Sequence, residues 1–401
     1  MAMKHKAASL QPSPLGQPIF DDVIALPAAV IKQSAVESNI QWMQQFANQA
    51  KVQLAPHGKT SMAPALFKRQ LMAGAWGITV ATAYQAQIAA QSGATRIIIA
   101  NQLLGKVNMA LVAQLLRQGI NIFCCVDSEI NANQLAAFFE HQQLQLPCLI
   151  ELGIENGRCG VRKPEHAKAL AEAIHAAEAL QLAGVEFYEG VASDQATVEQ
   201  WVHQAGQFCL QLHKEGLLEH KPALLTGAGS AWYDVVAEGF ARLNLPDGII
   251  PVLRPGCYVT HDHQLYQQLQ QQIQLRCPSA KVLDGDLTPA LELVAFIQSI
   301  PEPGLAVLGL GKRDVAYDAG LPQVVALYRN GHQIKVNLLT CETTKVMDQH
   351  AFWQFDSSVQ PQVGDIVVLG SSHPCLTFDK WRYIWLVDDH YRLLDTIETF
   401  F

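Results

Sequence analysis

Short apolar runs rich in β-branched residues alternate with longer segments of helical period between about residues 50 and 256. The apolar runs predict eight strands, at residues 52–55, 78–81, 97–100, 121–126, 147–152, 183–187, 223–226 and 249–253. The segments between them repeat apolar residues one helical turn apart, as Leu111 and Leu115 do before Gly119. This alternation is typical of parallel strands joined by crossover helices.

The number and spacing of these units indicate a fold class. Their strands begin roughly 20 to 40 residues apart, which is the size of one strand–helix unit. Eight units in one run predict an α/β fold, a (β/α)8 barrel of the TIM type, with catalytic groups at the carboxyl ends of its strands. An open doubly wound sheet is the alternative, although no segment resembles its GxGxxG opening.

The pattern changes after Arg254-Pro255-Gly256, where a glutamine-rich stretch at residues 263–274 is interpreted as a solvated junction. Strand-like runs follow at 291–297, 305–308, 324–328, 334–339, 366–369 and 392–397, and Asn330-Gly331 between two of them is a strong hairpin signal. We therefore predict a barrel domain over residues 26–265 and a C-terminal all-β domain over residues 266–401. The sequence leaves open whether residues 1–25 return to the β domain.

Composition limits the possible function classes. Of 401 residues, 49% are apolar and 16% are charged, against a usual charged share of about 25%, so much surface is expected to be buried in a core or an oligomer interface. The net charge of −8 provides no basic field for nucleic acid. Residues 70–95 carry no charge, but their four glutamines and strand-like run are unlike a transmembrane helix.

Two further features concern the compartment. The amino-terminal residues lack the apolar region of a secretory signal. The nine scattered cysteines, an odd number, indicate free thiols in a reducing environment. We therefore expect a cytoplasmic protein that does not enter a membrane.

A lysine follows the first predicted strand, in Leu54-Ala55-Pro56-His57-Gly58-Lys59-Thr60. At the mouth of a barrel and among uncharged neighbours, the Lys59 amine is expected to be partly desolvated, which lowers its pKa. These conditions suit a lysine that forms a Schiff base. A surface lysine after a strand is the alternative.

An arginine and a tyrosine follow the fifth and sixth predicted strands. Three glycines surround Arg158 between residues 153 and 160, and they predict a tightly bent loop that points the guanidinium at an anionic oxygen. Pairing of Arg158 with Glu151 or Glu155 is the alternative. Tyr188 stands where a planar ligand would lie, although such residues more often pack in a core.

Glycine-rich turns end the last two barrel strands, in Thr226-Gly227-Ala228-Gly229-Ser230 and Arg254-Pro255-Gly256-Cys257-Tyr258. Backbone N–H groups in these two loops form the common phosphate site of (β/α)8 barrels. One such turn alone is equally consistent with ordinary turn chemistry. Two turns at these positions favour a phosphate site.

A histidine and a cysteine stand two residues apart in Ser372-His373-Pro374-Cys375. In an extended backbone both side chains point to the same side and reach one borderline-soft cation such as zinc. A structural zinc site needs four ligands and no CxxC partner motif is present, whereas two protein ligands leave positions open for substrate and water. His350 has three alternative interpretations: a further metal ligand, a residue that hydrogen-bonds to a ligand, or an ordinary surface histidine.

Together these motifs resemble the D-serine dehydratase and D-threonine aldolase family of pyridoxal-phosphate enzymes, whose barrel is similar to that of alanine racemase. The resemblance extends from about Leu26 to Phe401. Its marks, in chain order, are Pro56-His57-Gly58-Lys59-Thr60, the Arg158 loop, Gly184-Val185-Glu186-Phe187-Tyr188-Glu189-Gly190, Arg254-Pro255-Gly256-Cys257-Tyr258 and Ser372-His373-Pro374-Cys375.

The resemblance implies roles for individual residues. Lys59 would form the Schiff base with pyridoxal 5'-phosphate, Arg158 would approach its phenolic oxygen, and Tyr188 would lie near its pyridine ring. The phosphate would be held by Gly229, Ser230, Gly256 and Cys257, and a divalent metal, expected to be zinc, by His373 and Cys375. Family members are typically homodimers in which the second domain of one chain completes the site of the other.

The resemblance also implies β-elimination from a D-3-hydroxy amino acid, with D-serine giving pyruvate and ammonia. D-threonine aldolases of the family tend to have an aspartate at the position of Cys375 and often a histidine at that of Ser61, so both differences favour the dehydratase branch. Retro-aldol cleavage is the nearest alternative. Racemisation requires a second base that the sequence does not identify, and a non-catalytic pyridoxal-phosphate carrier of barrel type would lack residues 266–401.

Overall fold

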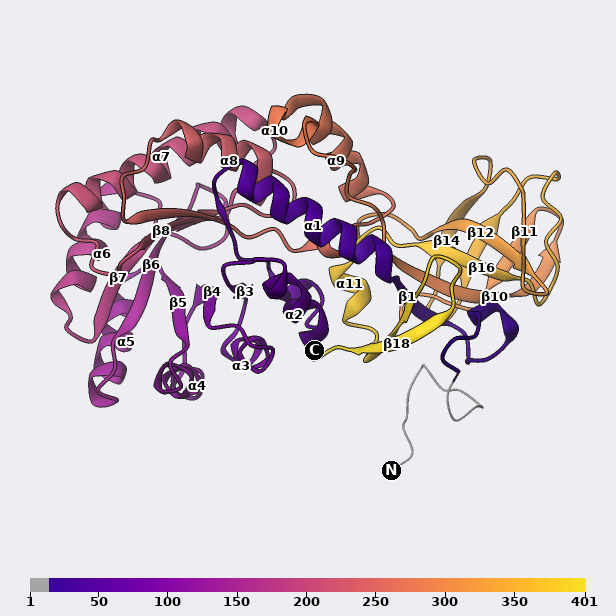
Figure 1. The fold of residues 1–401 in the computed structure, drawn as a ribbon, viewed down its shortest axis with the longest axis horizontal. Coiled ribbons are helices and arrows are strands. Elements are labelled where there is room, and N and C mark those ends of the chain that lie inside the picture. The colour runs from indigo at the N-terminus through magenta and orange to yellow at the C-terminus, as the bar shows by residue number, and fades with distance from the viewer. Residues whose placement is uncertain (1–13) are drawn as a thin grey trace.

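The computed structural model describes residues 14–401 and contains two sheets (Figure 1). One is a curled sheet of eight parallel strands surrounded by helices, and the other is a ten-stranded, mainly antiparallel sheet. The predicted (β/α)8 barrel with a C-terminal β domain is therefore confirmed. Residues 1–13, which belong to the segment whose placement the sequence left open, lie outside the described residues.

All eight predicted barrel strands are present: β2 (Gln53–Leu54), β3 (Ile78–Val80), β4 (Arg96–Gln102), β5 (Asn121–Val126), β6 (Leu146–Leu152), β7 (Leu180–Phe187), β8 (Ala223–Gly227) and β9 (Ile249–Leu253). Parallel pairing runs in the order β2-β9-β8-β7-β6-β5-β4-β3. A bridge between His57 and Thr79 joins the two ends of this order and closes the barrel. Its interior is filled by Ala55, Ile98, Phe123, Leu149, Ala183, Leu224 and Val252.

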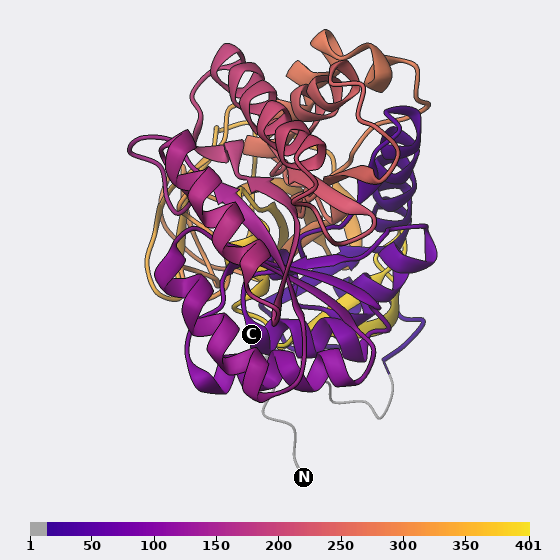
Figure 2. The ribbon, with the colours of Figure 1, turned by 90° about the vertical axis from the view of Figure 1, so that its left-hand side faces the viewer.

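Helices cover the outside of the barrel (Figure 2). They are α1 (Gln33–Gln49), α2 (Pro64–Met72), α3 (Ala83–Gln91), α4 (Lys106–Arg117), α5 (Glu129–His141), α6 (Pro164–Ala176), α7 (Gln195–Lys214) and α8 (Tyr233–Arg242). The side chains of Thr82, Ser128 and Asp194 cap α3, α5 and α7 by accepting a backbone hydrogen bond from the first turn. Every helix within residues 14–401 is too short or too polar to span a membrane.

The glutamine-rich stretch, predicted to be a solvated junction, forms a helix that is mostly exposed or half-buried but has a buried side at Gln270 and Ile273. Helix α9 (Leu265–Arg276) is followed by the short α10 (Pro278–Lys281). The Asp262 carboxylate caps α9 by accepting hydrogen bonds from backbone N–H groups of its first turn. Buried Gln270 accepts a hydrogen bond of 2.6 Å from the Tyr233 hydroxyl of α8. The polar sequence did not indicate this buried side of the helix, because a glutamine side chain can be buried when its amide group forms hydrogen bonds.

The β domain contains β10 (Leu291–Glu302), β11 (Leu305–Leu308), β12 (Gln323–Arg329), β13 (His332–Ile334), β14 (Glu342–Val346), β15 (Ala351–Gln354), β16 (Ile366–Gly370), β17 (Tyr383–Val387) and β18 (Leu393–Glu398). The early strand β1 (Ala28–Lys32) lies between β10 and β17, antiparallel to the first and parallel to the second. On these pairings we propose that the chain leaves the β domain after Lys32 and returns at Leu291, later than residues 26 and 265.

The Asn330-Gly331 hairpin is present, but the strand predicted at 334–339 is not. Both turn residues have positive φ, 50° and 76°, as the tight two-residue turn requires. Arg329 then pairs with His332, so the returning strand starts at once and ends at Ile334. Beyond it the Asn337 side chain accepts a hydrogen bond of 3.1 Å from the backbone N–H of Leu339, which forms a turn in place of a strand.

Residues 14–401 also contain four single 3-10 turns and a further short helix. The turns are η1 (Ile19–Asp21), η2 (Gly58–Thr60), η3 (Glu189–Val191) and η4 (Cys257–Val259), of which the last three follow β2, β7 and β9. Helix α11 (Cys375–Phe378) follows β16 and packs against η2, at the junction seen in Figure 1. The β domain therefore reaches the carboxyl-terminal mouth of the barrel.

Candidate active site

A cavity opens at the carboxyl ends of the barrel strands, where this fold carries its catalytic groups. Four of the predicted site residues, Lys59, Arg158, Tyr188 and Gly229, line it. Its other lining residues are His57, Ala81, Ala100, Asn101, Glu151, Glu186, Ala228 and Arg254. The chain thus brings together side chains that are up to about 200 positions apart, because parallel strands all end on the same side.

Lys59 lies in η2, the turn that follows β2. The turn needs glycine at position 58, because a Cβ atom there would lie 2.6 Å from the Phe67 ring. Burial lowers the pKa of the Lys59 amine; the charge of Cys375 opposes this shift, and the charge of Arg158 adds to it. Lys59 therefore has the partly desolvated surroundings that a Schiff-base lysine needs.

His57 is a cavity residue to which the sequence assigned no role. Its Nδ1 atom is buried and has no hydrogen-bond partner within residues 14–401. Burial and the charge of Lys59 together hold the pKa of His57 well below its usual value of 6.5. The imidazole beside Lys59 is therefore neutral at physiological pH, and its free nitrogen is available to a ligand or a water molecule.

Arg158 and Tyr188 contact each other at one side of the cavity. The Arg158 guanidinium lies over the Tyr188 ring, 4.1 Å from its centroid. Arg162 fixes the loop around Arg158 by donating hydrogen bonds of 2.5 to 2.6 Å to three of its backbone carbonyls. Glu151, which the sequence offered as an alternative partner of Arg158, accepts a 2.5 Å hydrogen bond from Gln102. The cation is thus held against an aromatic face beside the cavity, an attractive arrangement.

The two glycine-rich loops converge on Ser230. The backbone N–H groups of Gly256 and Cys257 point at the Ser230 hydroxyl oxygen, at 3.2 and 3.1 Å. Gly256 has no room for a side chain, since a Cβ atom would lie 2.5 Å from the Thr60 hydroxyl and 2.6 Å from the His57 carbonyl. Gly229 is held by the buried Glu189 carboxylate, which accepts its N–H at 2.7 Å. The four residues predicted to bind phosphate are therefore neighbours.

Three buried charged residues that line the cavity, Glu151, Glu186 and Arg254, were not identified as site residues from the sequence. Glu186 and Arg254 form a buried ion pair, and Arg254 also donates a 2.9 Å hydrogen bond to the Phe187 carbonyl. Burial, reinforced by the charge of Glu186, raises the pKa of Glu151 to about 7. The available signal was a glutamate inside each of two apolar strands, since such residues are seldom buried without a partner.

His373 lies between β16 and α11, and Cys375 is the first residue of α11. Pro374 between them has helical φ and ψ (−59° and −42°), so this segment is not extended, contrary to the prediction from the sequence. The Cys375 thiol lies 3.4 Å from the Thr60 hydroxyl, next to Lys59, and 3.6 Å from the Cys257 sulfur. His373 Nδ1 lies 2.7 Å from a carboxylate oxygen of Asp318. Such a carboxylate commonly orients a metal-binding histidine. Sequence reasoning did not find Asp318, because it lies 55 positions from His373.

A second group of acidic and sulfur side chains includes two residues of the cavity lining. Within residues 14–401, Cys125, Glu151 and Glu186 alone form a set of three potential metal-ligating side chains whose ligand atoms lie within 4.8 Å of one another. The adjacent Arg254 cation disfavours a metal there. His350 has an exposed side chain in the turn between β14 and β15.

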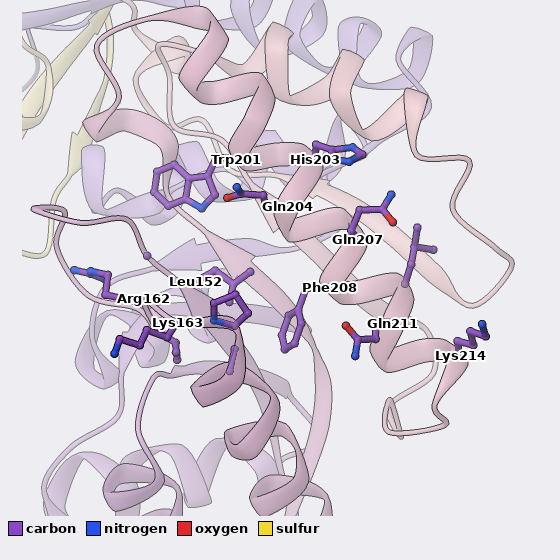
Figure 3. Close-up of a pocket in the computed structure, with 15 residues that line it drawn as sticks. Leu152, Arg162, Lys163, Trp201, His203, Gln204, Gln207, Phe208, Gln211 and Lys214 are labelled. Carbon is purple, nitrogen blue, oxygen red and sulfur yellow. The ribbon is translucent and has the colours of Figure 1, made fainter.

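A separate groove lies outside the barrel between α6 and α7 (Figure 3). Its lining includes Trp201 and Phe208 with the basic residues Arg162, Lys163 and Lys214. None of the predicted site residues lines it. The groove is therefore distinct from the candidate active site.

Two family models match the chain. The model described as "Alanine racemase, N-terminal domain" matches residues 31–239, more than half of the chain, and the "Putative serine dehydratase domain" matches residues 290–387. This protein belongs to the D-serine dehydratase and D-threonine aldolase family. The family consists of fold-type III pyridoxal-phosphate enzymes, as the barrel and its cavity indicate.

Named relatives within the family include both aldolases and dehydratases. The chain is 26% identical to a D-threonine aldolase of Arthrobacter sp over 368 residues, covering 90% of this chain and 89% of the relative. It is 31% identical to a D-threo-3-hydroxyaspartate dehydratase of Delftia sp. (strain HT23) over 242 residues, covering 59% and 61% of the two chains. Both relatives are lyases of D-amino acids by name, which supports a lyase here.

A solved structure shows the same fold. It is a cysteine-to-alanine variant of D-threo-3-hydroxyaspartate dehydratase in a metal-free form, and it matches this chain with a TM-score of 0.75 and 21% sequence identity. The match covers 96% of this chain and 99% of the solved chain. The likeness therefore includes both the barrel and the β domain.

The cavity of this family member fits pyridoxal phosphate. Arg254 Nε and Nη1 and one Glu186 oxygen are buried without a hydrogen-bond partner within residues 14–401. Buried polar atoms of this kind need a partner, and a polar ligand or water supplies one. The cavity therefore offers a partner for each part of this cofactor. The desolvated Lys59 amine matches its aldehyde, and the backbone N–H groups near Ser230 match its phosphate. The unpartnered polar atoms match its polar ring.

Proposed function

We propose that this protein is a pyridoxal-phosphate-dependent dehydratase, an ammonia-lyase type of enzyme, that acts on D-3-hydroxy amino acids. D-serine is the first candidate substrate, with pyruvate and ammonia as products. The proposal includes a divalent metal, Zn²⁺ first, at His373 and Cys375. The observation that carries it is the contact between Cys375 and Thr60, which brings a thiol of the β domain next to Lys59.

The cofactor would be held by residues on several strand ends. Lys59 would form the Schiff base, Arg158 would meet the phenolic oxygen, and Tyr188 would lie near the pyridine ring. The phosphate would lie among Gly229, Ser230, Gly256 and Cys257, where two backbone N–H groups already converge. When bound, the cofactor withdraws electrons from the substrate Cα and makes its proton removable.

Lys59 is the proposed base for that proton. Because burial lowers the pKa of its amine, the neutral form is more available at neutral pH than in an exposed lysine. The Cys375 thiol contacts the hydroxyl of Thr60, the residue next to Lys59. The partly buried Lys59 amine lines the cavity and would accept the Cα proton of a substrate bound there.

Loss of the β-hydroxyl group requires a strong acid, because hydroxide is a poor leaving group. His373 and Cys375 would hold the metal, and Asp318 would orient the His373 ring through the Nδ1 contact of 2.7 Å. A metal at this position supplies a Lewis acid for the β-hydroxyl oxygen. The metal-free form of the dehydratase variant with the same fold supports a metal in this branch of the family.

Retro-aldol cleavage is the second candidate function. The full-length match to the Arthrobacter D-threonine aldolase favours it. Cleavage requires a base for the β-hydroxyl proton, and neutral His57 is the cavity histidine that such a reaction would use. Elimination needs no such base, and Cys375 in place of an aspartate favours it. Racemisation remains a third possibility that the same assay measures.

Product analysis tests the proposal. The zinc-loaded holoenzyme is incubated separately with D-serine and D-threonine, and 2-oxo acid, glycine, aldehyde and the L-enantiomers are measured. The proposal predicts a 2-oxo acid and ammonia in equal amounts. Glycine and aldehyde as the only products would establish the aldolase, and an L-amino acid would establish a racemase.

The Lys59 assignment has its own test. Lys59→Ala is expected to lose the visible absorbance of the lysine-linked cofactor and to reduce turnover by about a thousandfold or more. The exposed Lys68 of α2 provides a matched control, Lys68→Ala, which should retain both. Unchanged absorbance in Lys59→Ala would show that another amine holds the cofactor.

A further inference from the structure

Two cysteines from different parts of the chain meet at the mouth of the barrel. Cys257 lies in η4 after the last barrel strand, and Cys375 begins α11 of the β domain. Their sulfur atoms are 3.6 Å apart. The backbone of Cys257 already has a place in the phosphate loop, through the N–H that points at Ser230. Its side chain has no part in the proposed function.

The separation of the two sulfurs matches a metal site. Zinc–sulfur bonds are about 2.3 Å long, so two thiolates on one tetrahedral zinc ion lie about 3.8 Å apart. The observed 3.6 Å is close to this value. The Thr60 hydroxyl lies 3.4 Å from Cys375 and 4.0 Å from Cys257, so the pair is also next to Lys59.

We propose that Cys257 is a third protein ligand of the metal, together with Cys375 and His373. The inference rests on the metal site of the proposed function and enlarges it. Metal binding would form two metal–sulfur bonds and release the thiol protons to solvent, with no change of oxidation state. Asp318 holds Nδ1 of His373, so Nε2 is the nitrogen that would bind the ion.

His373 must move toward the two sulfurs when the metal binds. Within residues 14–401, the ligand atoms of these three side chains do not all lie within 4.8 Å of one another. Cys257 and Cys375 already have the required spacing. Two sulfurs and one nitrogen would leave one position of a tetrahedral ion open, which is the arrangement of a catalytic zinc site.

This site would connect the metal to the cofactor loop. Cys257 would bind the ion through its side chain, while its N–H and that of Gly256 are placed to hold the phosphate. A metal on Cys257 would therefore restrain the loop that binds the phosphate. We expect zinc to strengthen pyridoxal-phosphate binding several-fold, an effect that the two-ligand site does not require.

X-ray absorption at the zinc edge tests the inference on the zinc-loaded holoenzyme. We expect two sulfur neighbours at about 2.3 Å in the wild-type protein and one in Cys257→Ser, with zinc affinity at least tenfold weaker in the variant. Cys341→Ser, a half-exposed cysteine of the β domain, is the matched control and should leave both values unchanged. If Cys257→Ser does not fold, the wild-type sulfur count decides alone.

The possible failures can be told apart. One sulfur neighbour in the wild-type protein would overturn the role of Cys257 and leave the site at His373 and Cys375 intact. A protein that binds no stoichiometric zinc would overturn both, and D-serine turnover measured on the same sample would show whether elimination proceeds without the metal. Loss of two titratable thiols without zinc would show a disulfide between Cys257 and Cys375 and would also overturn the inference.

Discussion

Arg254 and Glu186, which both line the candidate active site, form an ion pair in which each side chain is only 3% exposed. Arg254 follows β9 and Glu186 lies near the end of β7, so the pair crosses the intervening strand β8. Arg254 also donates to the Phe187 carbonyl at 2.9 Å. The pair therefore fixes two strand ends that carry cavity residues.

Removal of one partner should leave the other charge buried and unpaired. We expect Glu186→Leu to lower the free energy of unfolding by about 3 to 5 kcal/mol. Urea unfolding followed by circular dichroism measures this change. The exposed pair of Glu238 and Arg242, 3.3 Å apart in α8, is the control, and Glu238→Gln should cost less than about 1 kcal/mol. Equal effects of the two substitutions would contradict the assigned role of burial.

Glu151 should make stability depend on pH. Burial raises the pKa of the folded carboxyl to about 7 from its usual 4.5, so the folded state binds a proton that the unfolded state has lost. Stability should therefore fall as the pH rises from about 4.5 to about 7, by about 3 kcal/mol for this group.

Glu151→Gln removes the titrating group and keeps the side-chain shape. Urea unfolding of the cofactor-free wild type and variant at about pH 5 and pH 7.5 should show that the wild type loses about 2 kcal/mol more over this range. Glu155→Gln, at an exposed position in the loop that follows β6, should behave as the wild type. A parallel loss of stability in Glu151→Gln would mean that other groups cause the dependence.

Ser230 should matter for cofactor affinity. Its hydroxyl oxygen accepts the N–H groups of Gly256 and Cys257, so Ser230→Ala leaves two donors without this partner and removes a hydroxyl from the proposed phosphate site. We expect the dissociation constant of pyridoxal phosphate to rise about tenfold, measured by fluorescence titration. Exposed Ser193 provides the control Ser193→Ala. The same affinity in both variants would place the phosphate elsewhere.

A homodimer is the expected assembly. Large apolar side chains of the β domain are exposed in the single chain, among them Leu339 at 94% and Val363 at 65%. A partner subunit would cover such residues. Sedimentation velocity at micromolar concentration should therefore give a mass of about 88 kDa, twice the 44.0 kDa of the chain. A species of single-chain mass would contradict this expectation.

The sequence by itself determined the barrel, because its evidence is local. Each buried strand is a short apolar run and each helix repeats with its own period, so the eight strands were located to within a few residues. Lys59, Arg158 and Tyr188 were placed at the barrel mouth in the same way, since each lies in the segment that follows such a strand. The Asn330-Gly331 turn was equally local, because two positive φ angles require these residues.

Tertiary structure alone decided which distant residues meet. The ion pair of Glu186 and Arg254, the Asp318 contact of His373 and the contact of Cys257 with Cys375 join positions that are 55 to 118 residues apart. No periodic pattern in the sequence indicates such a pair, because the contact depends on how the strands close into a barrel and how the two domains pack together. The sequence thus determined which side chains stand at the strand ends, and the packing of the β domain against η2 decided that Cys375 lies beside Lys59.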